Sequence, residues 1–132
     1  MIEQGDETIL RNVLNRWKDG VDAHEPKDVS AIFTEDAIFQ GLHPYTVGRK
    51  GVADYYDSQP IGMTPDYQLL ETRRLADDAV LGYLSVTFAF TDRPSLRVWL
   101  SIVAVDSGAG WQISHYQVSY LPEPGRSDQI EP

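Results

Sequence analysis

Apolar residues recur at three- and four-residue steps near the start of the chain, between residues 6 and 24. A stripe with this spacing lies on one face of a helix, so the segment predicts an amphipathic helix. Its members are Ile9, Leu10, Val13, Leu14, Trp17 and Val21. A short second helix is expected from Pro26, because proline is tolerated in the first turn. Residues 48–58 predict a third helix with Val52, Tyr55 and Tyr56 on one face.

The pattern then changes to the two-residue alternation of strands. Residues 37–40 predict a short strand, and four longer strands are expected at 67–76, 80–91, 96–106 and 111–120. Residues rich in Asp, Pro, Ser and Gly separate the last four strands, as in hairpin connections. Helices followed by an antiparallel meander predict an α+β fold. We expect three N-terminal helices packed on the concave face of a strongly curved, mainly antiparallel sheet, a cone-like α+β barrel.

This arrangement predicts one domain over residues 1–121, enclosing a small-molecule cavity between the sheet and the helices. Residues 122–132 contain three prolines and predict a poorly ordered C-terminal tail. The formal net charge of −9 argues against binding to nucleic acid or to an anionic membrane surface. The chain contains no cysteine, and no apolar run approaches the roughly 20 residues of a membrane span. We expect a cytoplasmic protein.

Five segments carry a resemblance to a known superfamily. They are Arg16-Trp17 with Val21-Asp22, Ile32 to Ala37, Leu42-His43-Pro44, Gly48 to Val52, and Gly110 to His115. Over residues 5–121 the chain resembles the nuclear transport factor 2-like superfamily, and within it the SnoaL-like polyketide cyclase and ketosteroid isomerase-like group. The resemblance implies a homodimer formed by the convex sheet face and, in many members, chemistry on a small hydrophobic molecule.

The catalytic residues of ketosteroid isomerases are not retained here. The resemblance places Gly41 at their aspartate base, Trp17 at their oxyanion-binding tyrosine and Ile102 near their protonated aspartate. SnoaL-like relatives carry two alternate histidines and a serine on the last strand. The matching residues here are His115, Gln117 and Ser119, so a single histidine is kept.

His115 is the leading candidate for a catalytic acid or base, because histidine exchanges a proton near neutral pH. Strict alternation places it on one strand face with Trp111, Ile113, Gln117 and Ser119, and this face is predicted to line the cavity. A buried histidine held by hydrogen bonds is the structural alternative. His43, in the loop after the first strand, is a second candidate, with an exposed loop position as the alternative.

Three tyrosines add candidate hydroxyl groups. Tyr55 and Tyr56 are candidates for polarising a substrate oxygen, and Tyr45 is a candidate contact near the cavity mouth. Aromatic packing is the alternative for each. The further residues expected to contact substrate are Trp17, Phe39, Phe88, Leu100, Gln117 and Ser119. The three histidines have no metal-binding spacing, so we expect neither a metal nor a cofactor.

Arg97 and Trp99 alternate with Val98, Leu100 and Ile102, which predicts that they lie on the outer face of the sheet. An exposed tryptophan there favours a homodimer through this face. Three functions remain open. One is a cofactor-independent isomerase, cyclase or dehydratase acting on a hydrophobic, carbonyl-bearing metabolite of polyketide or steroid type. Another is a non-catalytic domain that binds or carries such a molecule. The third is an interaction domain whose important surface is the convex face of the sheet.

Overall fold

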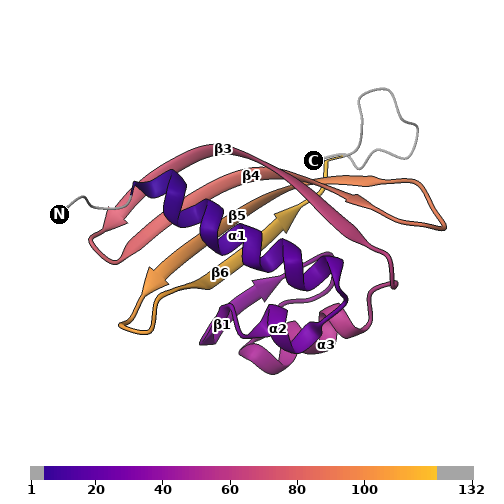
Figure 1. Ribbon diagram of the computed structural model, residues 1–132, viewed down its shortest axis with the longest axis horizontal. Helices are drawn as coiled ribbons and strands as arrows, with labels where there is room; N and C mark the ends of the chain where they lie inside the picture. The colour runs from indigo at the N-terminus through magenta and orange to yellow at the C-terminus, as the bar shows by residue number, and fades with distance from the viewer. Residues whose placement is uncertain (1–4, 122–132) are drawn as a thin grey trace.

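Six strands form one sheet in the order β2-β1-β6-β5-β4-β3 in the computed structural model, which describes residues 5–121 (Figure 1). The elements along the chain are α1 (Asp6–Asp22), α2 (Pro26–Ser30), β1 (Phe33–Gln40), β2 (Thr46–Val47), α3 (Arg49–Asp57), β3 (Thr64–Ala76), β4 (Ala79–Ala89), β5 (Leu96–Asp106) and β6 (Trp111–Ser119). The predicted tail at 122–132 lies outside the described residues.

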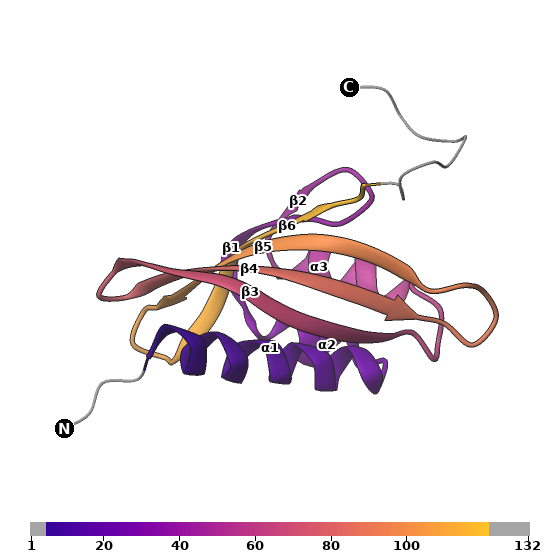
Figure 2. The same cartoon turned by 90° about the horizontal axis from the view of Figure 1, so that it is seen from above.

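The sheet is antiparallel except where β1 pairs with β6 in parallel. It curves around the helices, and α1 lies along its concave face (Figure 2). The predicted α+β fold is therefore confirmed, with the helices on one side of a curved, mainly antiparallel sheet. No helix among residues 5–121 is long and apolar enough to cross a membrane.

The first strand differs from its prediction. It begins at Phe33 instead of residue 37, and it includes Glu35 and Asp36. The alternation is hidden in the sequence because the pairing with β6 shifts between Phe33 and Ile38. In this irregular part of the strand Glu35 is exposed, although alternation would place it on the same face as the buried Phe33 and Ala37. The loop that follows contains the two-residue strand β2, which pairs with β1.

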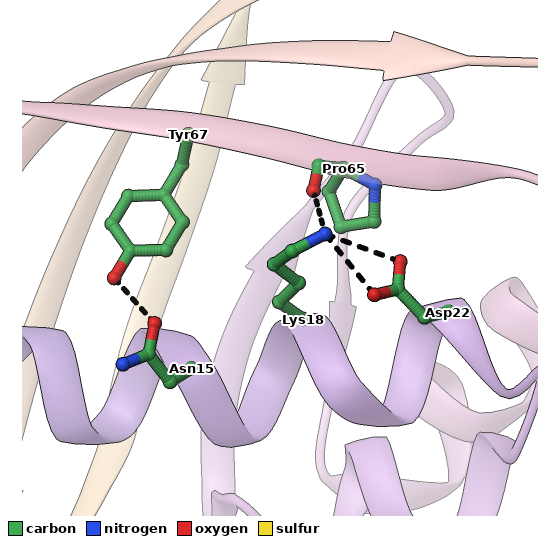
Figure 3. A network of polar contacts seen from close by, with 5 residues as sticks. All are labelled: Asn15, Lys18, Asp22, Pro65 and Tyr67. Atoms are coloured by element: carbon green, nitrogen blue, oxygen red, sulfur yellow. Dashed lines mark hydrogen bonds and ion pairs between the residues drawn. The ribbon is translucent and has the colours of Figure 1, made fainter.

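Polar contacts hold α1 against the edge strand β3 (Figure 3). The Tyr67 hydroxyl donates a hydrogen bond of 2.7 Å to Asn15 Oδ1. The Lys18 ammonium donates to the Pro65 carbonyl over 2.9 Å and forms an ion pair of 3.1 Å with Asp22. These contacts fix the position of the helix, while its apolar stripe, including Trp17, is buried against the sheet.

The core lies between α1, α2, α3 and the concave face of the sheet. Close approach of α1 and α2 requires glycine at position 20, since a Cβ there would lie 2.8 Å from a methyl group of Val29. Gly20 thus allows α2 to fold back under α1, where Val29 is fully buried.

Candidate functional site

Three aromatic side chains from three elements form a buried hydrogen-bonded relay. Trp17 of α1 donates from Nε1 to the Tyr56 hydroxyl of α3 over 3.0 Å. The Tyr56 hydroxyl donates to the Tyr116 hydroxyl of β6 over 3.1 Å. All three residues are buried, with at most 3% of their surface exposed. We refer to Trp17, Tyr56 and Tyr116 as the relay.

Burial keeps both relay tyrosines protonated. Loss of solvation raises the pKa of Tyr56 well above its usual range. The pKa of Tyr116 is also raised well above 10, mainly by burial and further by the nearby Tyr56. At neutral pH both hydroxyls therefore act as hydrogen-bond donors and acceptors, and neither supplies a phenolate base.

Phe39 packs tightly against the relay. Its ring stacks on Tyr116 with the centroids 4.5 Å apart, and it meets Tyr56 edge-on at 5.7 Å. Trp17 in turn contacts Phe88 edge-on at 6.2 Å. These contacts fix the ring orientations, so the relay hydroxyls have little freedom to move.

A small, largely enclosed cavity of about 50 Å³ lies beside the relay. Tyr116 forms part of its wall, and the others are mostly apolar residues of α3, β4, β5, β6 and the adjoining loops. They are Leu42, Tyr55, Gln59, Met63, Phe88, Phe90, Leu96, Val98 and Val118. No side chain in this wall carries a formal charge. The cavity is thus an apolar space bordered by a few neutral polar groups.

Tyr55 anchors the loop at the edge of this cavity. Its ring lies against Gly41, where a Cβ would come within 2.7 Å of the ring, and it meets the exposed His43 edge-on at 5.7 Å. Burial raises the pKa of Tyr55, and a backbone hydrogen bond from Leu42 opposes part of this rise. Leu42 lines the cavity while 49% of its surface is exposed. The loop at Leu42 is therefore the cavity wall nearest to solvent.

The structure corrects the predicted orientation of β6. Pairing with β5 shifts at Ser114, where β6 contains one extra residue. Ile113 and Tyr116 both face inward as a result, while His115 lies opposite Val103 on the outer face. Because of this bulge the two-residue alternation fails within the strand. His115 thus lies on the opposite side of the sheet from the cavity.

Gln117 and Ser119 follow His115 onto the outer face. They pair with Ser101 and Trp99 of β5, and both are exposed. The prediction that this polar series lines the cavity is therefore wrong, and the inner positions of the strand belong to Tyr116 and Val118.

The remaining predicted residues fall into three groups. Tyr55 and Phe88 line the cavity. Tyr56, Trp17, Phe39 and Leu100 are buried in the adjoining core and are not part of the cavity wall. Tyr45 and His43 are exposed on the loop between β1 and β2, with His43 in contact with Tyr55.

Sequence reasoning missed Tyr116, the relay residue that borders the cavity. A signal was present. Ile113, Tyr116 and Val118 are three large apolar or aromatic residues of the strand, and strict alternation cannot place all three on one face. A bulge between Ile113 and Tyr116 brings all three to the inner side, where Ile113 and Tyr116 are buried and Val118 is partly buried.

Arg97 and Trp99 lie on the outer face, as predicted, beside the buried positions Val98 and Leu100. The Arg97 guanidinium lies 5.2 Å above the Trp99 ring. Larger hollows occur on the surface. One of about 670 Å³ is lined by Glu35, Asp36 and Arg49 among others, but it is open to solvent. Across residues 5–121, no three His, Asp or Glu side chains are grouped closely enough to hold a metal ion.

Solved structures of proteins with low sequence identity share this fold. A ketosteroid isomerase-like protein from Erwinia carotovora atroseptica aligns with a TM-score of 0.77 at 18% identity, covering 92% of this chain and 100% of that one. A nuclear transport factor 2-like protein with a cystatin-like fold from Novosphingobium aromaticivorans gives 0.73 at 14% identity, with 92% and 84% covered. A scytalone dehydratase-like protein from Novosphingobium aromaticivorans gives 0.74 at 13% identity, with 89% and 85% covered.

No family model matches the chain, and no curated protein matches it. The structural likeness establishes that the chain has the nuclear transport factor 2-like fold, as the sequence resemblance predicts.

Proposed function

We propose that this protein binds a small, uncharged, mainly apolar molecule in the cavity beside the relay, and that binding is its primary activity. The observation that carries the proposal is the composition of the cavity wall. Apolar side chains from several elements surround a space that also borders the hydroxyl-bearing Tyr116 and Tyr55 and the amide of Gln59. Ligand sites of proteins combine an apolar lining with a few polar groups in this way.

The wall also limits the charge of the ligand. None of its side chains is cationic or anionic, and moving an unpaired charge into an apolar site is costly. The best fit is therefore a neutral molecule with one polar atom near the tyrosine hydroxyls.

The cavity size sets a further limit. Sites for drug-sized ligands measure about 300–1,000 Å³, whereas this cavity measures about 50 Å³. In this conformation it suits a ligand of a few heavy atoms. A larger polyketide- or steroid-like ligand requires outward movement of the loop that carries Leu42, the most exposed part of the wall.

Catalysis is the second candidate, and the position of His43 favours it. His43 contacts Tyr55, which lines the cavity, so it is the described histidine best placed to exchange a proton with a ligand at the cavity edge. Cofactor-independent isomerisation, cyclisation or dehydration of a carbonyl compound would suit such an arrangement. Structural neighbours include ketosteroid isomerase-like and scytalone dehydratase-like proteins, and those activities are named for the neighbours alone.

Titration with a ketone series tests the binding proposal. Acetone, cyclopentanone and cyclohexanone are added to isotopically labelled protein while the NMR signals of the Val98 and Val118 methyl groups are followed. We expect saturable shifts for at least one ketone. Val118→Trp should fill the cavity and abolish the shifts of the Val98 methyl groups, whereas Gln117→Trp, the matched change on the outer face, should leave these shifts intact. Shifts absent throughout the series, or equal in both variants, would refute the proposal.

For the second candidate, turnover of the bound ketone is followed in the wild type and in His43→Ala. Loss of turnover with retained binding supports a catalytic His43. If both proteins bind the ketone and neither converts it, the catalytic candidate is refuted and only the binding function remains.

We further propose that the protein is a homodimer through the outer sheet face. The apolar side chains that support this proposal are Ile38, Val47, Tyr83 and Trp99, of which the first three are exposed and Trp99 is half-buried. Sedimentation equilibrium of the wild type and of Trp99→Glu tests it. A wild-type dimer converted to monomer by the variant supports the proposal, and a monomeric wild type refutes it.

A further inference from the structure

The direction of the hydrogen bonds in the relay follows from its first member. An indole Nε1–H donates and cannot accept. Trp17 therefore occupies a lone pair of the Tyr56 oxygen, over 3.0 Å. The Tyr56 hydrogen then needs an acceptor of its own, and the Tyr116 oxygen lies 3.1 Å away.

The reverse direction would leave a buried hydrogen without a partner. If Tyr116 donated to Tyr56, the Tyr56 hydrogen would face the packed rings of Trp17, Phe39 and Tyr55, since Tyr56 is not part of the cavity wall. In the forward direction the unpaired hydrogen belongs to Tyr116. No hydrogen bond donated by Tyr116 is found among residues 5–121, and Tyr116 borders the cavity. A ligand in the cavity can accept this hydrogen.

We propose that Trp17 sets the direction of the relay, so that Tyr116 presents a hydrogen-bond donor to the cavity and selects ligands by their acceptor. The favoured ligand class is a neutral carbonyl compound such as a ketone, aldehyde, ester or quinone. An alcohol of the same shape is disfavoured, because its own hydroxyl hydrogen must also find an acceptor in an apolar cavity. This inference rests on the proposed binding function. Trp17 acts in it as a positioning residue and Tyr116 as the group that contacts the ligand.

Affinities for cyclopentanone and cyclopentanol, measured by NMR titration, test the selectivity. In the wild type the ketone should bind roughly tenfold more tightly, because one buried hydrogen bond separates the two ligands. In Tyr116→Phe both ligands lose the hydrogen bond that they accept from Tyr116, so both affinities should fall while the ketone remains the tighter ligand.

Trp17→Phe tests more directly than Tyr116→Phe whether Trp17 sets the direction of the hydrogen bonds. Without the indole donor the relay can reverse, and the Tyr116 oxygen can then accept from the alcohol. The ketone-to-alcohol ratio should therefore collapse even though Tyr116 is retained. A purely structural role of Trp17 would weaken both ligands equally and keep the ratio, and this result would overturn the proposal.

A measurement without ligand separates this inference from the binding proposal and does not depend on the folding of any variant. Hydroxyl protons in the wild-type relay are assigned by NMR, and their nuclear Overhauser contacts are recorded. We expect the Tyr116 hydroxyl proton to contact methyl groups of the cavity wall, and the Tyr56 hydroxyl proton to contact the Tyr116 ring. A Tyr116 hydroxyl proton that contacts the Tyr56 ring would overturn the assigned direction. Failure of both ligands to bind, with the expected contacts present, would instead refute the binding function.

Discussion

His115 and Tyr116 are neighbours in β6 but lie in opposite environments. Tyr116 is 2% exposed, belongs to the relay and borders the cavity. His115 lies on the outer face between Val103 of β5 and Ile38 of β1. The residue with the more familiar catalytic chemistry is therefore on the wrong side of the sheet for the cavity. Side-chain chemistry identifies candidates, but the register of the strand decides which candidate can act there.

The largest expected effect is the difference in lost stability between an inner-face and an outer-face substitution at neighbouring positions of β5. Ile102 is fully buried on the inner face, and Val103 is half-buried on the outer face. Ile102→Ala should lower the free energy of unfolding by about 2–5 kcal/mol, because it leaves a cavity in the core. Val103→Ala should cost less than about 1 kcal/mol in the monomer. Urea denaturation measures both, and equal losses would contradict the assignment of the faces.

We expect the two buried relay tyrosines on the inner face to make the free energy of unfolding sensitive to alkaline pH. In the unfolded chain tyrosine ionises with a pKa of about 10, whereas burial raises the pKa of Tyr56 and Tyr116 in the folded protein. Their protonated state thus stabilises the fold at neutral pH, and this contribution is lost as pH rises above about 10. Above this pH the two residues together should lower the free energy of unfolding by up to about 2.7 kcal/mol for each pH unit.

Denaturation at a series of pH values between 9 and 11.5 measures this slope. Tyr116→Phe should remove up to about 1.4 kcal/mol per pH unit of it. An unchanged slope in Tyr116→Phe would show that its hydroxyl ionises freely in the folded state.

Gly41 provides a test of the wall nearest to solvent. In Gly41→Ala the added Cβ would lie 2.7 Å from the Tyr55 ring, so the ring or the loop must shift. We expect a loss of roughly 1–3 kcal/mol in the free energy of unfolding, together with altered ketone affinity. In a Tyr55→Ala background the same change should cost much less. Equal costs in both backgrounds would exclude the Tyr55 ring as the cause.

The smallest expected effect is that of His115→Ala. The side chain is half-buried on the outer face and makes no contact with the cavity wall. The free energy of unfolding of the monomer should change by no more than about 0.5 kcal/mol. Ligand affinity should not change at all. A loss of several kcal/mol would indicate that His115 is buried in a way the described structure does not contain.

The α+β fold, the order of the helices and the four-stranded meander were predictable because their periodicities are regular over many residues. For β5 the predicted range coincides with Leu96–Asp106. The outer position of Arg97 and Trp99 followed from the same alternation. These predictions succeeded where local pattern and tertiary environment agree.

The candidate site was only partly predictable, because it depends on irregularities. The extra residue at Ser114 changes which residues of β6 face the core. The shifted pairing between Phe33 and Ile38 interrupts the alternation that would identify the first half of β1 as a strand. Of the predicted site residues, Tyr55 and Phe88 line the cavity. The hydrogen bonds that join Trp17, Tyr56 and Tyr116 connect residues 39 and 60 positions apart, and no local pattern encodes such distances.

Cyclopentanone binding to the wild type, Tyr116→Phe and His115→Ala tests most directly whether the inner face of β6 carries the function. Dissociation constants are measured by NMR titration under identical conditions. The inner-face assignment predicts wild-type affinity for His115→Ala and a roughly tenfold loss for Tyr116→Phe. Wild-type affinity in Tyr116→Phe combined with a loss in His115→Ala would contradict it and place the ligand on the outer face of the sheet.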